Sequence, residues 1–314
     1  MRFQLLLVGL ATIVCFLIGG ARWRERIMST QTYASAERSG RWMIVSGDYT
    51  GLRGTSRDRG TESISGFSNV QANQAWDLSP DQRRAALVDT YSYSGSPGIK
   101  VFAANRADPI AEAAPSSGAT FYCPLFDDNG SLLFLETLGS YGELRRLDVP
   151  KVDSANATSR VTDVRTATVI SSSDCFERTA DGEHLAWYGS DSQIHIARST
   201  PSGFLGDHKS FPGTEFALSS DGSQLAVRDG SGIQIIDVAT GNQRQLTSDP
   251  TYSTLIDFSP DGRWLAVMKA GSFSANGLVA LRVSDASIIS LPTNRGSYFY
   301  AQPGQVAARW VARP

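Results

Sequence analysis

Two stretches of ten residues decide the fold: LSSDGSQLAV at 218–227 and FSPDGRWLAV at 258–267. They align without gaps and begin 40 residues apart. Because self-similarity at such a period is the signature of repeat architectures, we compared the whole chain with this unit. Weaker copies surround Asp81, Asn129 and Asp181, and a degenerate copy ends at Pro303-Gly304. The chain therefore repeats one unit at intervals of 40 to 52 residues.

Each unit has the pattern of a β-hairpin followed by two further strands. Asp-Gly or Asn-Gly separates two short apolar segments, and both turn residues tolerate a positive φ. In the unit that contains Asp221, the segments 232–238 and 243–246 predict the third and fourth strands. Four-stranded units of about 40 to 45 residues are typical of propeller blades. The expected fold is thus all-β, a β-propeller of four-stranded antiparallel blades.

The number of blades depends on how the ring closes. One strand, 306–311, remains after Gly304, and the segments 42–49 and 62–70 would complete its blade from outside. This arrangement removes free edges and predicts six blades. In the alternative, residues 39–45 form another hairpin turn and strand, and the propeller has seven blades.

The amino terminus has the features of a membrane-directed leader. Residues 3–20 are almost entirely apolar, Arg2 precedes them, and Arg22, Arg24 and Arg26 follow. Eighteen helical residues reach about 27 Å, enough for a bilayer core. Residues 1–26 are therefore expected to be a signal peptide or a single transmembrane anchor with a basic flank. A linker at 27–40 and a propeller at 41–314 complete the predicted organisation.

The side of the membrane on which the propeller lies has two interpretations. A short basic start, an apolar core and the small residues 19–21 describe a secretory signal, which favours a bacterial-type periplasm or the extracytoplasmic face. The three arginines after the apolar segment favour a cytoplasmic propeller instead, by the positive-inside rule. We favour export, with the chain either anchored or secreted.

The motif at 259–262, together with DVATG at 237–241 and QLT at 245–247, resembles the TolB-type, WD-like propeller repeat. The resemblance spans about 41–314 and is weaker in the units of Asp81, Asn129 and Pro303. It implies a periplasmic or membrane-associated propeller that docks other proteins. Similar propellers also cover the active site of prolyl-oligopeptidase-type peptidases, but this chain has neither room for that hydrolase domain nor a Gly-x-Ser-x-Gly motif.

The composition argues against several functions. The chain of 314 residues has 29 basic and 31 acidic residues and no basic block, which makes a nucleic-acid partner unexpected. Its three histidines, His184, His195 and His208, show no metal-ligand spacing, and His195 alternates with isoleucines as a partly exposed strand residue would. No cofactor motif is present, so no cofactor and no catalytic residue is predicted.

Three carboxylates share one place in the repeat, four residues before the turn aspartate. They are Asp77, Glu177 and Asp257. Carboxylate oxygens at one level near a propeller axis could bind Ca²⁺. The favoured interpretation is that they accept hydrogen bonds from neighbouring backbone or hydroxyl groups, which makes them weak metal candidates.

Cys123 and Cys175 lie six residues before the turns of adjacent units, and hence at equivalent places on neighbouring inner strands. In an oxidising compartment they could form a disulfide. The alternative is two small buried hydrophobic residues.

Loops between the second and third strands all emerge on one face of a propeller. Arg53, Tyr91, Tyr93 and Phe273 lie in three such segments, although with six blades the segment of Arg53 joins outer strands instead. Arginine and aromatic residues are enriched in binding hot spots, so these four are candidate partner-binding residues. The sequence thus predicts a non-enzymatic, membrane-linked docking scaffold or accessory subunit of a membrane or envelope complex. The rival is a lactonase-like or metal-dependent propeller hydrolase.

Overall fold

The computed structural model describes fourteen stretches of the chain, whose ranges are 42–48, 51–56, 60–63, 67, 75–79, 83–89, 98–106, 108–127, 129–150, 160–171, 175–179, 181–269, 278–290 and 308–312. For 42–48, 51–56, 60–63 and 308–312 it describes the backbone alone. The predicted leader and linker at 1–40 lie outside these residues.

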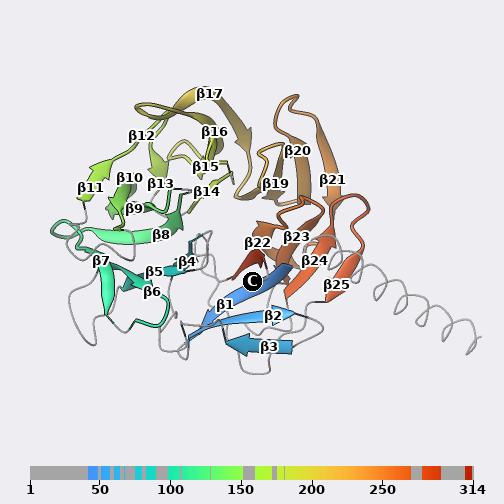
Figure 1. Cartoon of the computed structure of the whole chain (residues 1–314). Helices are drawn as coiled ribbons and strands as arrows, with labels where there is room; N and C mark the ends of the chain where they lie inside the picture. Colours follow the sequence, from blue (N-terminus) through green and yellow to red (C-terminus); the bar gives the residue numbers. More distant parts are fainter. Residues whose placement is uncertain are drawn as a thin grey trace, which may run out of the picture.

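The described residues form strands and no helix, and the strands make six sheets. Figure 1 shows these sheets arranged around a centre, with β4, β8, β14 and β22 toward the middle. This is the all-β propeller architecture that the repeat predicts. The number of blades in the complete chain stays a prediction.

Five sheets follow one another along the chain, and we number them as blades 1 to 5. Blade 1 contains β4 (Trp76–Leu78), β5 (Arg84–Asp89), β6 (Gly98–Ala103) and β7 (Pro109–Ala113). Blade 2 contains β8 (Thr120–Phe126), β9 (Leu132–Leu138), β10 (Tyr141–Asp148), β11 (Arg160–Asp163) and β13 (Ile170–Ser171). Blade 3 contains β14 (Phe176–Arg178), β15 (His184–Tyr188), β16 (Gln193–Thr200), β17 (Gly203–Pro212) and β12 (Arg165–Thr166).

The last two numbered blades have four strands each. Blade 4 contains β18 (Glu215–Leu218), β19 (Gln224–Asp229), β20 (Gly232–Asp237) and β21 (Gln243–Thr247). Blade 5 contains β22 (Tyr252–Phe258), β23 (Trp264–Lys269), β24 (Leu278–Arg282) and β25 (Ile288–Ser290). Adjacent strands are antiparallel, except where β12 joins β17 in parallel.

The turn between the first two strands has the same construction in successive blades. In blade 5 the Ser259 amide donates to the Trp264 carbonyl at 2.8 Å, and the Gly262 amide donates back to Ser259 at 2.7 Å. Thr179 and Ser219 make the equivalent bonds in blades 3 and 4. The turns of Asp181, Asp221 and Asp261 are therefore equivalent, as predicted, whereas Asp81 and Pro303 lie outside the described residues. The turn of Asn129 is closed one residue earlier, by the Asp127 amide donating to the Ser131 carbonyl.

Within these turns the glycine, and not the aspartate, takes the positive φ. Gly182, Gly222 and Gly262 take φ values of +70°, +70° and +66°, but the preceding aspartates keep a negative φ. The aspartate acts through its side chain instead. Asp221 accepts hydrogen bonds from the Ser219 hydroxyl at 2.7 Å and the Ser223 amide at 3.0 Å, which holds the turn closed.

The sixth sheet joins the two ends of the described chain. Its order is β26 (Ala308–Ala312), β1 (Trp42–Asp48), β2 (Gly51–Ser56) and β3 (Gly60–Ser63). Here β1 from the amino-terminal segment pairs with β26 from the carboxyl-terminal segment, and the strands differ from the expected ones. Three strands come from the amino-terminal segment, and β3 begins and ends before most of the expected strand 62–70. Pairing of β1 with β2 and of β2 with β3 makes a meander here, which the sequence pattern did not reveal.

The core lies between successive blades. Val88 and Val101 of blade 1 belong to one buried cluster with Phe121 and Phe134 of blade 2. The rings of Phe121 and Phe134 meet edge to face with centroids 4.7 Å apart. Blade 2 has buried apolar residues on both faces, in one cluster shared with blade 1 and one shared with blade 3, so its burial requires a neighbour on each side, and the ring supplies it.

No helix among the described residues is long and apolar enough to span a bilayer. The apolar leader lies outside them.

Candidate functional site

The inner-strand carboxylates connect neighbouring blades. Asp77 on β4 is 3% exposed, and its carboxylate accepts a hydrogen bond of 2.7 Å from the Phe126 amide on β8. Glu177 on β14 accepts in the same way from the Leu218 amide on β18. Phe126 and Leu218 hold the same place in the repeat, three residues before the turn. Two of the three weak metal candidates therefore already accept interblade hydrogen bonds.

Blade 4 has an alanine at the equivalent position, Ala217, and uses another residue for its contact. Glu215, two residues earlier on β18, accepts from the Leu255 amide on β22 at 3.1 Å. Its second oxygen accepts from Arg228 at 2.7 Å. The described part of the chain contains no group of three or more histidine, cysteine, aspartate or glutamate side chains that could hold a metal.

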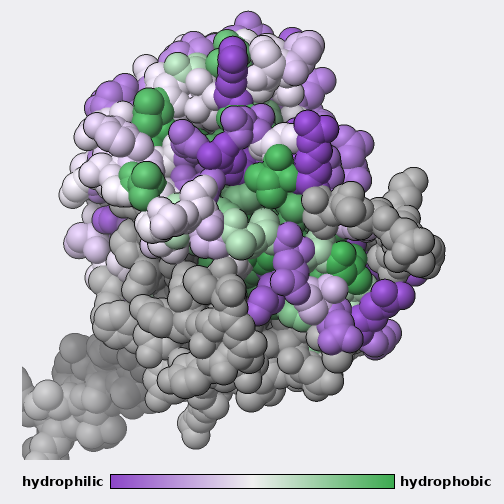
Figure 2. Space-filling model, turned by 90° about the vertical axis from the view of Figure 1, so that its left-hand side faces the viewer, coloured by the Kyte–Doolittle hydropathy of each residue, from purple (hydrophilic) through white to green (hydrophobic). Residues whose placement is uncertain are grey.

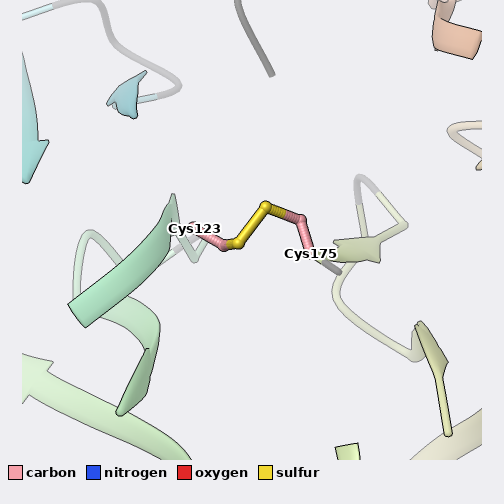
Figure 3. Close-up of a disulfide and its surroundings, with 2 residues drawn as sticks. All are labelled: Cys123 and Cys175. Carbon is pink, nitrogen blue, oxygen red and sulfur yellow. A yellow bond between two sulfur atoms is a disulfide. The ribbon is translucent and has the colours of Figure 1, made fainter. Parts of the chain in front are cut away.

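Cys123 and Cys175 form a disulfide, with their Cα atoms 5.4 Å apart (Figure 3). The bond connects the inner strand of blade 2 to the segment before β14 of blade 3. Blade 2 has Leu125 where blades 1 and 3 have a carboxylate, so no side-chain acceptor is present at this position. The disulfide links blade 2 to blade 3 covalently instead. Cys123 takes a φ of +56°, inside a bulge of β8 between Tyr122 and Leu125.

The structure brings together two histidines that the sequence spacing did not connect. Antiparallel pairing places His195 of β16 opposite Ser210, diagonal to His208 of β17. His195 Nδ1 lies 2.9 Å from His208 Nε2, and His195 Nε2 lies 2.8 Å from the Asp191 carboxylate. The rings stack beside Trp187.

In this arrangement both ring nitrogens of the buried His195 have hydrogen-bond partners, so neither is exposed as a catalytic base. His195 is 1% exposed, so the expectation of a partly exposed side chain is wrong. The Asp191 carboxylate accepts from the Nε2–H of His195, and His195 Nδ1 shares a second hydrogen bond with His208 Nε2. Burial and then the charge of His195 lower the pKa of His208. The group is best described as a hydrogen-bonded chain that fixes the β15–β16 turn.

The candidate partner-binding residues fall in different places. Arg53 lies within β2, paired with Ser46 and Ser63, so its assignment to a loop is wrong. Strand β2 lies within the segment that was expected to be a loop. Tyr91, Tyr93 and Phe273 lie outside the described residues, and as partner-binding residues they remain a prediction.

A surface that the sequence analysis missed lies on blade 2. Its exposed apolar side chains are Leu138, Tyr141, Val161 and Val169, with exposed fractions of 64%, 60%, 45% and 49%. They are four of the six large apolar side chains that the described residues expose strongly. Figure 2, viewed from the side on which β10 and β11 lie, shows green apolar groups among purple hydrophilic ones.

The strand register places Leu138, Tyr141 and Val161 on one face of the sheet, the face whose buried residues pack against blade 1. Leu138 pairs directly with Tyr141, and Tyr141 pairs with Ser171 on its other side. Val169 lies two residues before Ser171, just outside β13. Val161 is opposite Leu147, which belongs to the same row of β10 as Tyr141 and is itself buried in the cluster shared with blade 1. We call this set the apolar surface of blade 2.

No family model matches the chain. No curated protein matches it in sequence. Among solved structures, TolB from Acinetobacter baumannii superposes with a TM-score of 0.59 and 18% identity, over 88% of this chain and 67% of that chain. A candidate 6-phosphogluconolactonase from Bacteroides uniformis has a TM-score of 0.49 and 11% identity, over 86% of this chain and 99% of that chain. The chain therefore has a TolB-like propeller fold.

Proposed function

We propose that this chain is a non-enzymatic, membrane-linked propeller that docks other proteins on the extracytoplasmic side of a membrane. The apolar surface of blade 2 is the observation that carries the proposal. Large exposed apolar groups are costly in water and, when gathered on one face, are typical of interaction sites. A rigid face of this kind suits docking, because little conformational entropy is lost on association.

The inner strands support association over turnover. A hydrolase needs carboxylates or histidines that are free to bind a metal or move a proton. Here Asp77 and Glu177 accept backbone hydrogen bonds from the next blade, and His195 is bound on both ring nitrogens. These residues are committed to holding the propeller together.

Two features support the extracytoplasmic location. A disulfide between Cys123 and Cys175 persists in oxidising compartments such as the periplasm. The apolar leader at 3–20 has the composition of an export signal or an anchor. Together they favour a propeller that is exported and held at, or released near, the membrane.

The test is co-purification of the full chain from host membranes in mild detergent. The triple variant Leu138→Ser, Tyr141→Ser, Val161→Ser should lose the proteins that accompany the wild type. The matched control is Leu205→Ser, Ile288→Ser, which removes exposed apolar groups from blades 3 and 5 and should retain them. If the triple variant folds normally and still co-purifies with the same proteins as the wild type, the proposal is overturned.

A further inference from the structure

A group of charged side chains lies on the same sheet face as the apolar surface of blade 2. Glu136 pairs with Glu143 across β9 and β10, each two residues from Leu138 or Tyr141. Arg145, the next residue of this row, pairs with Asp163 on β11. The register thus places one arginine and three carboxylates beside the apolar side chains.

These charges are bound to one another but do not balance. Arg145 contacts Glu136 at 2.9 Å and Glu143 at 2.6 Å, and it also pairs with Asp163. Three carboxylates around one guanidinium leave a formal surplus of two negative charges. We call this group the acidic border.

The surplus charge faces solvent. The side chains of Glu143 and Asp163 are 71% and 80% exposed, whereas Arg145 is 19% exposed and already has three partners. Burial acts to raise the pKa of Glu136, but hydrogen bonds from Ser116 and the charge of Arg145 outweigh it, so its pKa is lowered. Because the side chains of Glu143 and Asp163 are exposed, they can contact a cation from outside as well as Arg145.

We propose that the apolar surface of blade 2 and its acidic border bind a segment of a partner protein that carries apolar and basic side chains side by side. This inference rests on the proposed docking function and specifies the chemistry of the partner. Apolar contacts would provide affinity, and Lys or Arg beside them would neutralise Glu143 and Asp163. An anionic bilayer is disfavoured because the border repels it. Face-to-face pairing with a second copy would bring two acidic borders together.

Site-specific crosslinking in the full chain tests the proposal. Tyr141→p-benzoylphenylalanine keeps an aromatic group on the surface and reacts with whatever covers it in host cells. Mass spectrometry of the crosslinked product should identify a partner peptide with Lys or Arg beside apolar residues. Adding Glu143→Lys and Asp163→Lys should reduce the crosslink yield about tenfold, because like charges then meet across the interface.

The control makes the same change of charge elsewhere. Glu183 and Asp207 flank Arg198 on blade 3 as exposed carboxylates, and Glu183→Lys with Asp207→Lys should leave the crosslink unchanged. Raising the salt concentration from about 0.1 M to 1 M should lower the crosslink yield of the protein that keeps Glu143 and Asp163, since screening shortens the range of these charges.

Several results would overturn the inference: an acidic or uncharged partner peptide, a lipid adduct, a crosslink to a second copy or to residues 1–41, or no crosslink. A yield that is insensitive to charge reversal would do so as well. The docking function is tested separately by the serine variant of the apolar surface. If that variant loses partners while the charge-reversed chain keeps them, docking stands and the basic partner is rejected.

Discussion

The carboxylate of Asp77 accepts a 2.7 Å hydrogen bond from the backbone amide of Phe126, 49 residues later and one blade further round the ring. Equivalent contacts link blades 3 and 4 and blades 4 and 5, and a disulfide links blades 2 and 3. Each junction between successive numbered blades therefore has at least one specific link in addition to apolar packing. Hydrophobic contacts are non-directional, so such links help to fix how one sheet sits on the next.

Removing the Asp77 acceptor should destabilise the fold. Asp77→Ala leaves the buried Phe126 amide without its partner, and an unsatisfied buried donor costs about 1–3 kcal/mol. Asp77→Asn retains an oxygen acceptor, so its free energy of unfolding should fall distinctly less than that of Asp77→Ala. Urea unfolding of the two variants measures the difference. Equal free energies of unfolding would show that the hydrogen bond to Phe126 does not stabilise the fold.

Reduction of the disulfide should also lower stability. Cys123 and Cys175 enclose a loop with a sequence separation of 52 residues, for which the chain-entropy model gives about 4 kcal/mol. Cys123→Ala with Cys175→Ala should show a loss of this order under oxidising conditions. Thermal unfolding with and without a dithiol reductant provides the comparison, and the double variant should not respond to the reductant. A wild-type protein that is equally insensitive would contradict the assigned bond.

The turn glycines should differ in their tolerance of a side chain. At Gly262 an added Cβ would contact only the Gln224 amide at 3.8 Å, so Gly262→Ala incurs mainly the cost of a positive φ, about 1–2 kcal/mol. At Gly222 the Cβ would also lie 2.9 Å from the Thr179 methyl of blade 3. We therefore expect Gly222→Ala to be the more destabilising. Equal unfolding midpoints for Gly222→Ala and Gly262→Ala would argue against a close contact between Gly222 and Thr179 of the neighbouring blade.

Acid should weaken the fold through the turn aspartates. Burial acts to raise the pKa values of Asp181 and Asp221, but hydrogen bonds from neighbouring hydroxyl and amide groups outweigh it, so both values are lowered. A depressed folded pKa contributes stability above the unfolded value, about 3.9, and that stability is lost as pH falls through the folded value.

The measurement is the free energy of unfolding between about pH 7 and 2.5. Asp181→Asn with Asp221→Asn should flatten its decline below pH 4, since Asn cannot be protonated there. Parallel curves for the variant and the wild type would rule out these two carboxylates as the cause.

Local signals in the sequence determined the blade unit. Asp-Gly turns between alternating apolar segments, repeated at 218–227 and 258–267, were sufficient to predict strands, hairpins and a propeller. The equivalent positions of Asp77 and Glu177 also follow from the repeat, as does the favoured interpretation that they accept backbone hydrogen bonds. The strands and hairpins depend on residues close together in the chain, where spacing and geometry correspond directly.

Only the tertiary structure decided which distant residues meet. The contact of His195 with His208 depends on the register of β16 and β17, and the exposure of the apolar surface of blade 2 depends on how much of that sheet face blade 1 covers. Spacing also predicted a loop at Arg53, where strand pairing produced β2. The physical reason is that side-chain periodicity specifies the two faces of a strand, whereas register and the neighbouring blade determine what each face touches.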